Sequence, residues 1–276
     1  PRLVHFTNMS HPKDTGSIYN MSFNWDFDNG HYSTAKDTSI TFFASTQQDS
    51  IYQVYLKGYS EHGCKDSISK TIRVYPDPKA SFIVDNQQGC GPLNVNFTNT
   101  STPNDTGTID HMGFYWEFGN GTISTSKDST VQYLPSTAQD TSYQVTLIAF
   151  SEHQCSDTSS LNIKVFPKPN AAFSSNLSSG CSPLNVQFSN SSDPKDTSSI
   201  NDMDFLWKFS DGNTTTQKDP LKTLANTSNN IDSLPIKLYA YSEHGCLDSI
   251  SKNIMVKPSP EISFFQSDSL ACDSLN

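Results

Sequence analysis

The 276-residue sequence lacks the hallmarks of several common protein classes. Charged residues make up only 17% of it, and its lysines and arginines form no basic stripe. Nucleic acid is therefore not expected as a partner, because a phosphate backbone requires clustered cations. The longest apolar run, near residues 145–150, has the length of a strand, far short of the ~18 residues of a membrane span. No long stretch carries apolar residues at helical spacing.

Catalytic and metal-binding signatures are also missing. No C-x-x-C pair occurs, which argues against a zinc or redox motif. No G-x-S-x-G nucleophile elbow occurs either, and a triad would have to arise on segments that recur along the chain. We therefore expect no enzyme activity and no cofactor.

Calcium is a candidate ligand on the basis of the acidic loops. Oxygen-rich loops can hold Ca²⁺, and the third part of the chain is rich in them, at Asp193, Asp196, Asp202 and Asp204. The ligand count is uneven along the chain and no EF-hand pattern is present, so we favour solvated loops. Turn hydrogen bonds are the expected role of Asp14, Asp105 and Asp196.

The sequence does contain an internal repeat with a step of 91 residues. The tryptophans show it, at Trp25, Trp116 and Trp207. The six cysteines form two series with the same step, namely Cys64, Cys155 and Cys246, and Cys90, Cys181 and Cys272. A unit of this length is too long for a solenoid repeat and has the size of one small domain.

Pro-x-Pro segments mark the joints between the copies. They occur at 76–78, 167–169 and 258–260. Because each proline fixes φ and lacks an N–H, these segments favour short, stiff linkers and hence an elongated rod. The expected domains are 1–76 (lacking its first strand), 77–167 and 168–258, with 259–276 as the opening strand of a further copy. With no leader peptide or initiator Met, we expect the parent chain to continue on both sides.

Within each copy, apolar residues alternate with polar ones, as Leu93, Val95 and Phe97 do in the second copy. This period of two indicates strands with one face in a core. The second copy should have strands near 80–85, 93–99, 112–118, 122–126, 130–134, 142–150 and 157–166. Seven strands predict an immunoglobulin-like β-sandwich in which each tryptophan anchors the core. Pro235 in the third copy removes a ladder donor, so its strand should be an edge or locally distorted.

The segments around the tryptophans resemble the W-x-F-G-D-G motif of the PKD (polycystic kidney disease-like) domain. They read W-D-F-D-N-G at 25–30, W-E-F-G-N-G at 116–121 and W-K-F-S-D-G at 207–212. The downstream Y-x-V-x-L of that family occurs at 52–56 and 143–147, whereas the third copy has L-P-I-K-L. All three copies depart from a strict G-D-G turn and carry an insertion before the tryptophan strand.

Tandem PKD-like domains with cysteines at these places resemble arrays in large Bacteroidota surface proteins, including gliding-motility adhesins and type IX secretion cargo. The resemblance implies an extracellular or cell-surface location and a non-catalytic stalk or filament segment that spaces an adhesive tip. Neighbouring repeats are the implied partners, with surface polysaccharide or cell-envelope anchor proteins as further candidates. The alternative is a carbohydrate- or protein-binding accessory region of a secreted hydrolase, with Tyr19, Tyr32 and Tyr115 as candidate sugar-stacking residues.

Regularly spaced cysteines favour disulfides and an oxidising compartment. In an immunoglobulin-like sandwich the first and last hairpins lie at opposite ends, so Cys90 and Cys155 would be ~25 Å apart. A disulfide needs Cα atoms within ~7 Å. We therefore predict an inter-domain bond between Cys90 and Cys246, with partners outside this window for Cys64, Cys155, Cys181 and Cys272. Intradomain bonds Cys90–Cys155 and Cys181–Cys246, or unpaired thiols, remain alternatives.

A Glu-His pair precedes each cysteine of the first series, at Glu61-His62, Glu152-His153 and Glu243-His244. One interpretation is a metal site or a pH-sensitive joint. One histidine and one glutamate per copy form a thin ligand set, so we favour a polar hairpin tip, with the glutamate reaching the neighbouring domain.

Two short sequence patterns point to glycosylation. Asp-Ser followed by Ile, Leu or Thr resembles the O-glycosylation signal of Bacteroidota, and the candidates are Ser50, Ser67, Ser129, Ser233, Ser249 and Ser269. Asn-x-Ser/Thr occurs at Asn8, Asn99 and Asn190. Both patterns are expected by chance in a chain so rich in Ser and Thr.

Overall fold

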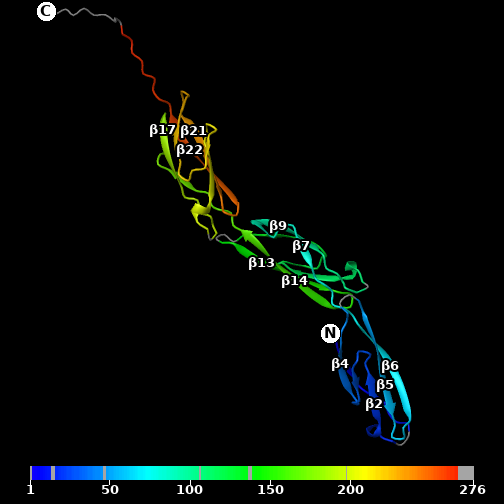
Figure 1. The fold of residues 1–276 in the computed structure, drawn as a ribbon. Helices are drawn as coiled ribbons and strands as arrows, with labels where there is room; N and C mark the ends of the chain where they lie inside the picture. Colours follow the sequence, from blue (N-terminus) through cyan, green and yellow to red (C-terminus); the bar gives the residue numbers. More distant parts are fainter. Residues whose placement is uncertain are drawn as a thin grey trace, which may run out of the picture. The chain divides into compact units, whose positions relative to one another are not determined.

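The chain is an all-β protein built from tandem immunoglobulin-like β-sandwiches (Figure 1). The computed structural model describes residues 2–13, 16–45, 48–105, 107–135, 139–196 and 198–266. The helices of these ranges are short 3₁₀ turns at Ile18–Asn20, Ile109–His111 and Ile200–Asp202. None of the helices in the described ranges could cross a membrane.

The chain divides into two compact units. The first consists of residues 1–87, 94–131 and 143–163, and the second of residues 88–93, 132–142 and 164–276. The middle 91-residue copy contributes to both units, and one joint between copies falls within each unit.

The first copy has two sheets around one core. A two-stranded sheet pairs β1 (Arg2–Phe6) with β4 (Thr38–Phe42). A four-stranded sheet has the order β3-β2-β5-β6, from β3 (Tyr32–Ser33), β2 (Ser22–Asp26), β5 (Ser50–Tyr59) and β6 (Lys65–Val74). Side chains of both sheets meet in one apolar cluster, which includes Trp25 and Phe42.

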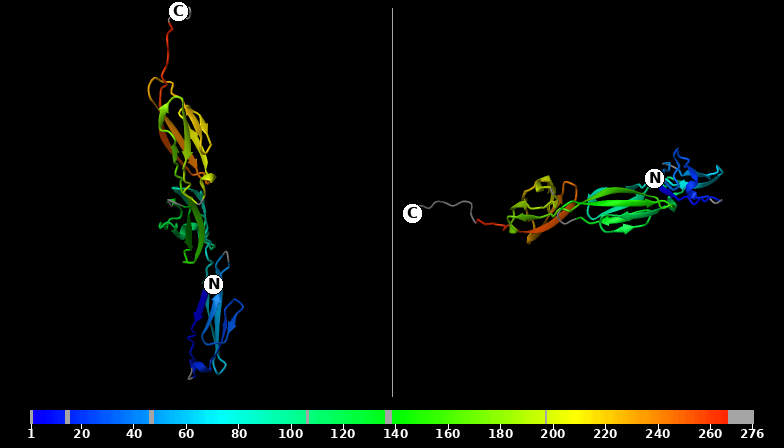
Figure 2. Two further views of the ribbon diagram at one scale, coloured as in Figure 1. Left: turned by 90° about the vertical axis from the view of Figure 1, so that its left-hand side faces the viewer. Right: turned by 90° about the horizontal axis from the view of Figure 1, so that it is seen from below.

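The second copy, in the cyan-to-green part of the chain in Figure 2, also has two sheets. The larger has the order β11-β10-β13-β14-β8 and the smaller β12-β9-β7. Their bounds are β7 (Phe82–Val84), β8 (Gln88–Cys90), β9 (Leu93–Asn99), β10 (Gly113–Glu117), β11 (Ile123–Ser124), β12 (Ser129–Tyr133), β13 (Thr141–Phe150) and β14 (Ser156–Phe166). Seven of these eight strands lie where the alternation predicts them.

The third copy repeats this pattern, with sheets β16-β22-β21-β18-β19 and β15-β17-β20. The strands are β15 (Phe173–Ser175), β16 (Ser179–Cys181), β17 (Leu184–Asn190), β18 (Asp204–Lys208), β19 (Thr214–Thr215), β20 (Leu221–Leu224), β21 (Asp232–Tyr241) and β22 (Leu247–Lys257). Pro235 lies in β21 opposite Asn253. On its other side β21 pairs with β18 only from Lys237 to Tyr241, so Pro235 occupies a locally unpaired edge, where its missing N–H is tolerated.

The strand that the sequence did not predict is β8, together with its counterpart β16. Both are three residues long, and they run parallel to the last strand of their copy, with Cys90 opposite Phe166 and Cys181 opposite Lys257. A segment this short, with glycine at its centre, carries no alternating pattern. These strands matter for function because each ends in a cysteine.

The tryptophans lie in the cores. Trp116 and Trp207 are fully buried, and Trp25 is nearly so. Each indole Nε1 donates a hydrogen bond to the carbonyl ten residues ahead, at 2.9 to 3.0 Å. The buried donor is thereby satisfied, and the loop after the tryptophan strand is held to the core.

Candidate functional site

The Pro-x-Pro linkers are bonded to the copy that follows them. In the first linker region, Lys79 and Thr102 exchange two backbone hydrogen bonds of 2.8 and 2.9 Å, and the Ala80 N–H donates to Asp157. In the second, Asn170 and Asp193 exchange the same pair at 2.7 and 3.0 Å. Backbone donors and acceptors beside the prolines are therefore fixed, as expected for stiff linkers.

The hairpins that carry the Glu-His pairs share one turn. The N–H of Ser60, Ser151 and Ser242 donates to the carbonyl of the cysteine four residues on, at 2.8 to 2.9 Å. The residue before each cysteine has a positive φ, which suits Gly63 and Gly245 and is also adopted by Gln154. The prediction of a hairpin tip is correct, and the turn presents histidine and cysteine two residues apart.

Each tip histidine of the second and third copies stacks on an aromatic ring that immediately precedes a linker. His153 lies on Tyr75 with ring centroids 3.5 Å apart and planes tilted by 19°. His244 lies on Phe166 at 3.8 Å and 24°. A ring stacked at this distance is worth about 0.5–1.5 kcal/mol beyond its buried area. Histidine makes this contact, and the glutamates of the same tips, Glu152 and Glu243, lie 3.5 and 3.3 Å from Nε2 of their own neighbouring histidines.

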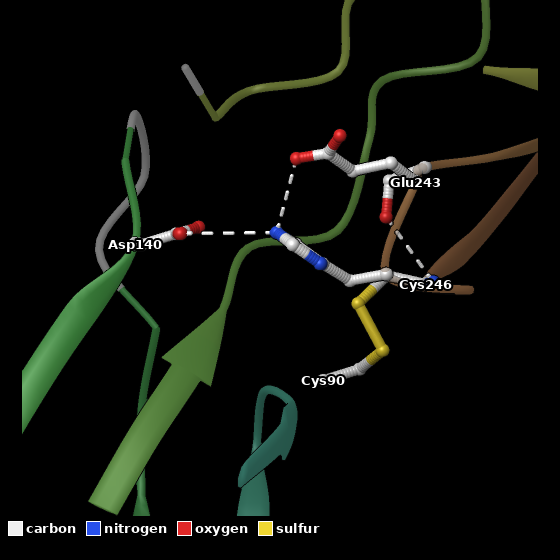
Figure 3. Close-up of a disulfide and its surroundings, with 6 residues drawn as sticks. Cys90, Asp140, Glu243 and Cys246 are labelled. Carbon is white, nitrogen blue, oxygen red and sulfur yellow. Dashed lines mark hydrogen bonds and ion pairs between the residues drawn. A yellow bond between two sulfur atoms is a disulfide. The ribbon is translucent and has the colours of Figure 1, made fainter. Parts of the chain in front are cut away.

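Charged side chains surround the second of these stacks. Asp140 pairs with Lys164 at 2.9 Å, and the same carboxylate oxygen lies 3.8 Å from Nε2 of His244. Glu243 approaches that Nε2 to 3.3 Å (Figure 3). At the first stack, Asp49 and Arg73 form the equivalent ion pair at 3.6 Å, 91 residues earlier. The pattern is thus repeated, with a largely buried carboxylate and a partly exposed cation in each pair.

The cysteine of the third tip completes the site. Cys246 forms a disulfide with Cys90, with Cα atoms 5.5 Å apart (Figure 3). This is the pairing predicted across the joint, and it rules out the intradomain alternatives for these two residues. The structure leaves Cys64, Cys155 and Cys181 unbonded, and Cys272 lies outside the described residues. The loop between Cys90 and Cys246 spans 156 residues, and closing it stabilises the folded chain by about 5 kcal/mol in the chain-entropy model.

Two groups of side chains bring three ligand-type atoms within 4.8 Å of one another: Asp140, Asp196 and His244, and Asp105, Glu152 and His153. The carboxylates already have protein partners, since Asp140 is bound by Lys164 and Asp196 by the N–H of Ser198 at 2.9 Å. Of the four acidic residues considered for calcium, Asp196 belongs to the first group, whereas Asp193, Asp202 and Asp204, all among the described residues, belong to neither.

Turn hydrogen bonds explain most of the loop carboxylates. Asp105 accepts a hydrogen bond from the Gly107 N–H at 2.7 Å, and Asp196 accepts one from the Ser198 N–H. Both have the predicted role in a turn. Asp14, the third residue of that prediction, lies outside the described residues. The N–H and hydroxyl of Ser199 lower the pKa of Asp202. Hydrogen bonding to Lys195, 2.7 Å away, lowers the pKa of Asp193. These bonds favour the charged carboxylate and order the loops.

The glycosylation candidates differ in accessibility. Ser67, Ser233 and Ser249 are exposed, Ser50 and Ser129 are half-buried, and Ser269 lies outside the described residues. The side chains of Asn8, Asn99 and Asn190 are buried, and each accepts a hydrogen bond from the N–H two residues on. These three asparagines are structural turn residues and cannot carry a glycan in the folded chain.

The candidate sugar-stacking tyrosines differ in exposure. Tyr19 and Tyr32 are exposed, and Tyr115 is half-buried. The Lys36 ammonium lies over the Tyr19 ring, 5.9 Å from its centroid.

Comparison with known proteins finds matches among solved structures. No family model and no curated protein matches the chain. Among solved structures, it is similar to the PKD1 domain of the Vibrio cholerae metalloprotease PrtV, at 32% identity over 32% of this chain and 96% of that one, with a TM-score of 0.26.

Two further solved structures are similar. The PKD1 domain of Vibrio anguillarum Epp is 22% identical over 33% of this chain and 96% of that one, with a TM-score of 0.27. The fibronectin(III)-like modules of Clostridium thermocellum CbhA are 13% identical over 68% of this chain and 100% of that one, with a TM-score of 0.33. The chain is thus similar to PKD and fibronectin(III)-like domains.

Proposed function

We propose that this chain is a non-catalytic spacer segment of a secreted or cell-surface bacterial adhesin, in which stacked repeats hold an adhesive tip away from its anchor. The observation that carries the proposal is the recurring joint. The same tip, aromatic ring and ion pair occur twice at a 91-residue step, first with Tyr75 and then with Phe166. A joint copied along a chain serves a uniform spacer better than a single active site.

Covalent bonding of one joint supports a mechanical role. The Cys90–Cys246 bond links the first hairpin of one copy to the last hairpin of the next, so tension along the backbone can pass through the cystine. A disulfide also favours an oxidising, extracellular compartment. The sequence resemblance to gliding-motility adhesins and type IX secretion cargo supports such a stalk. Neighbouring repeats are the proposed partners, and surface polysaccharide or cell-envelope anchor proteins are further candidate partners.

Force spectroscopy on the full chain, held at both ends, tests the proposal. With the bond intact, the 156 residues between Cys90 and Cys246 cannot extend, which removes about 560 Å from the final length. Reductant should restore that length, and a Cys246→Ser chain should extend fully under both conditions. A wild-type chain that reaches full extension without reductant would contradict the proposal, because the covalent link across the joint, on which the mechanical role rests, would be absent.

The runner-up function is carbohydrate or protein binding as an accessory region of a secreted hydrolase. The exposure of Tyr19 and Tyr32 in the first copy favours it. Affinity electrophoresis through gels containing polysaccharide separates the two functions, because a spacer migrates unchanged. Retardation that disappears in Tyr19→Ala or Tyr32→Ala would support the accessory function.

A further inference from the structure

Cys181 occupies the same backbone position as Cys90, the cysteine that is bonded. Cys90 ends β8 opposite Phe166, and the next N–H, of Gly91, donates to the Phe166 carbonyl at 2.9 Å. Cys181 ends β16 opposite Lys257, and the Ser182 N–H donates to the Lys257 carbonyl at 2.9 Å. Cys181 is exposed and has no disulfide. The third copy therefore presents a thiol in the geometry that is seen bonded to a hairpin tip one copy earlier.

Asp140, Lys164 and Phe166 surround the hairpin tip that is bonded to Cys90, and their counterparts near Cys181 are all different residues. Ile231, Met255 and Lys257 stand 91 residues after Asp140, Lys164 and Phe166, respectively. The strand register places the three around Cys181, because Ser179 pairs with Met255 and Asp232 with Val256. Two apolar side chains replace an ion pair, and a cation replaces an aromatic ring. Cys181, Ile231, Met255 and Lys257 are called the Cys181 end below.

A Glu-His tip does not suit the Cys181 end. His244 stacks on a ring and lies 3.8 Å from the Asp140 carboxylate. At the Cys181 end the same imidazole would meet the Lys257 ammonium in place of the Phe166 ring, and Ile231 in place of Asp140. The exposed fractions of Ile231 and Met255, 55% and 41%, instead leave apolar surface for a neighbour to cover.

We propose that the Cys181 end is a docking surface for the last-hairpin tip of a further repeat, whose cysteine bonds to Cys181 and whose residue two positions before that cysteine is aromatic instead of histidine. An aromatic ring there packs on Ile231 and Met255 and takes the Lys257 ammonium over its face. The two thiols lose two protons and two electrons to a disulfide oxidant, such as oxidised glutathione, which becomes two thiols. This inference rests on the proposed function, since it takes the neighbour to be another repeat.

The chain's own first tip, Glu61-His62-Gly63-Cys64, provides the probe, because Cys64 is exposed and unbonded. The recipient is the full chain with C64S, C155S and C272S, which keeps Cys181 available. The donor is the full chain with C155S, C181S and C272S, which keeps Cys64 available. Both keep the Cys90–Cys246 bond. Cross-linking in a glutathione buffer is read by non-reducing electrophoresis and by mapping of the linked peptide.

An H62W donor should link to the recipient about fivefold more at equilibrium than the unmodified donor, the size of a cation–π and packing gain. A recipient with I231D, M255K and K257F should instead link more to the unmodified donor than to the H62W donor. If this triple variant unfolds at too low a temperature, the single K257F recipient replaces it and should link equally to both donors. Equal linking by the H62W and unmodified tips, or an unchanged preference in the K257F recipient, would overturn the inference. Either result would leave the force measurement on Cys90–Cys246 unaffected, so the two proposals fail separately.

Discussion

His153 lies face to face on Tyr75, with ring centroids 3.5 Å apart. Tyr75 is the residue between the end of β6 and the Pro76-Asp77-Pro78 linker. The same relationship joins His244 to Phe166 before the next linker. At the first stack no disulfide assists the contact, because Cys155 is unbonded. In this chain the stack at the first joint can therefore be tested without a disulfide, whereas the second joint combines the stack with the Cys90–Cys246 bond.

Removing the first ring should loosen the linker. Tyr75→Ala deletes the surface under His153 and should cost about 0.5–1.5 kcal/mol of local stability. Hydrogen exchange at the Ala80 amide, which donates to Asp157, should accelerate several-fold. Tyr19→Ala, at an exposed tyrosine of the first copy, is the control and should leave that amide unchanged. An unchanged Ala80 amide in Tyr75→Ala would mean that the stack does not hold the linker.

Breaking the disulfide should destabilise the chain measurably. Cys246→Ser removes the closure of a 156-residue loop, and we expect a loss of up to about 5 kcal/mol in the free energy of unfolding. Urea unfolding with and without reductant measures it. Reductant should lower the midpoint of the wild type and of a Cys181→Ser control, but not that of Cys246→Ser. A wild-type midpoint insensitive to reductant would show that the bond adds no stability.

The core tryptophans are the next test. Trp207→Phe leaves a void and removes the 2.9 Å bond from Nε1 to the Gln217 carbonyl, at a cost of about 2–3 kcal/mol. Tyr32→Phe, at an exposed site, should change stability by less than about 0.5 kcal/mol. Chemical unfolding followed by circular dichroism compares them, and near-equal losses would contradict the anchoring role of the indole.

One ion pair predicts a pH dependence. Lys222, 2.6 Å from Asp211, holds the pKa of that carboxyl below its ordinary 3.8. Because the folded pKa is lowered, the pair stabilises the fold above pH 3.8, and this contribution is lost as the pH falls through the lower folded value. Both groups are partly exposed, so Asp211→Asn should cost at most about 1 kcal/mol at pH 7, and this cost should shrink as the pH falls below 3.8. A cost that does not change between pH 7 and acidic pH would exclude this ion pair as its origin.

The sequence predicted the architecture well because its signals are local and repeated. Alternation located the strands of the second copy, including β9 and β13, and the step of 91 residues aligned the copies. The Cys90–Cys246 pairing followed from topology, since the hairpins of one sandwich lie at opposite ends. Strand β8 was not predicted, because three residues are too few to show an alternating pattern.

The joint was only partly predictable. The Glu-His repeats marked the tips, but histidine and not glutamate makes the contact across to Tyr75. Nothing in the spacing links His153 to a ring 78 positions earlier, because that contact depends on how one copy's last hairpin meets the preceding strand. Comparing the residues before each Pro-x-Pro, Tyr75, Phe166 and Lys257, would have drawn attention to the position. The Asp49–Arg73 and Asp140–Lys164 pairs are equally non-local.

The radius of gyration of the full chain in solution tests the central claim, that the repeats stack end to end as a spacer. Three stacked sandwiches of roughly 35 Å each give a rod of about 100 Å and a radius of gyration near 30 Å. A single compact globule of 276 residues would give about 19 Å. Small-angle X-ray scattering should return the larger value for the oxidised chain, and a value near 19 Å would contradict the account.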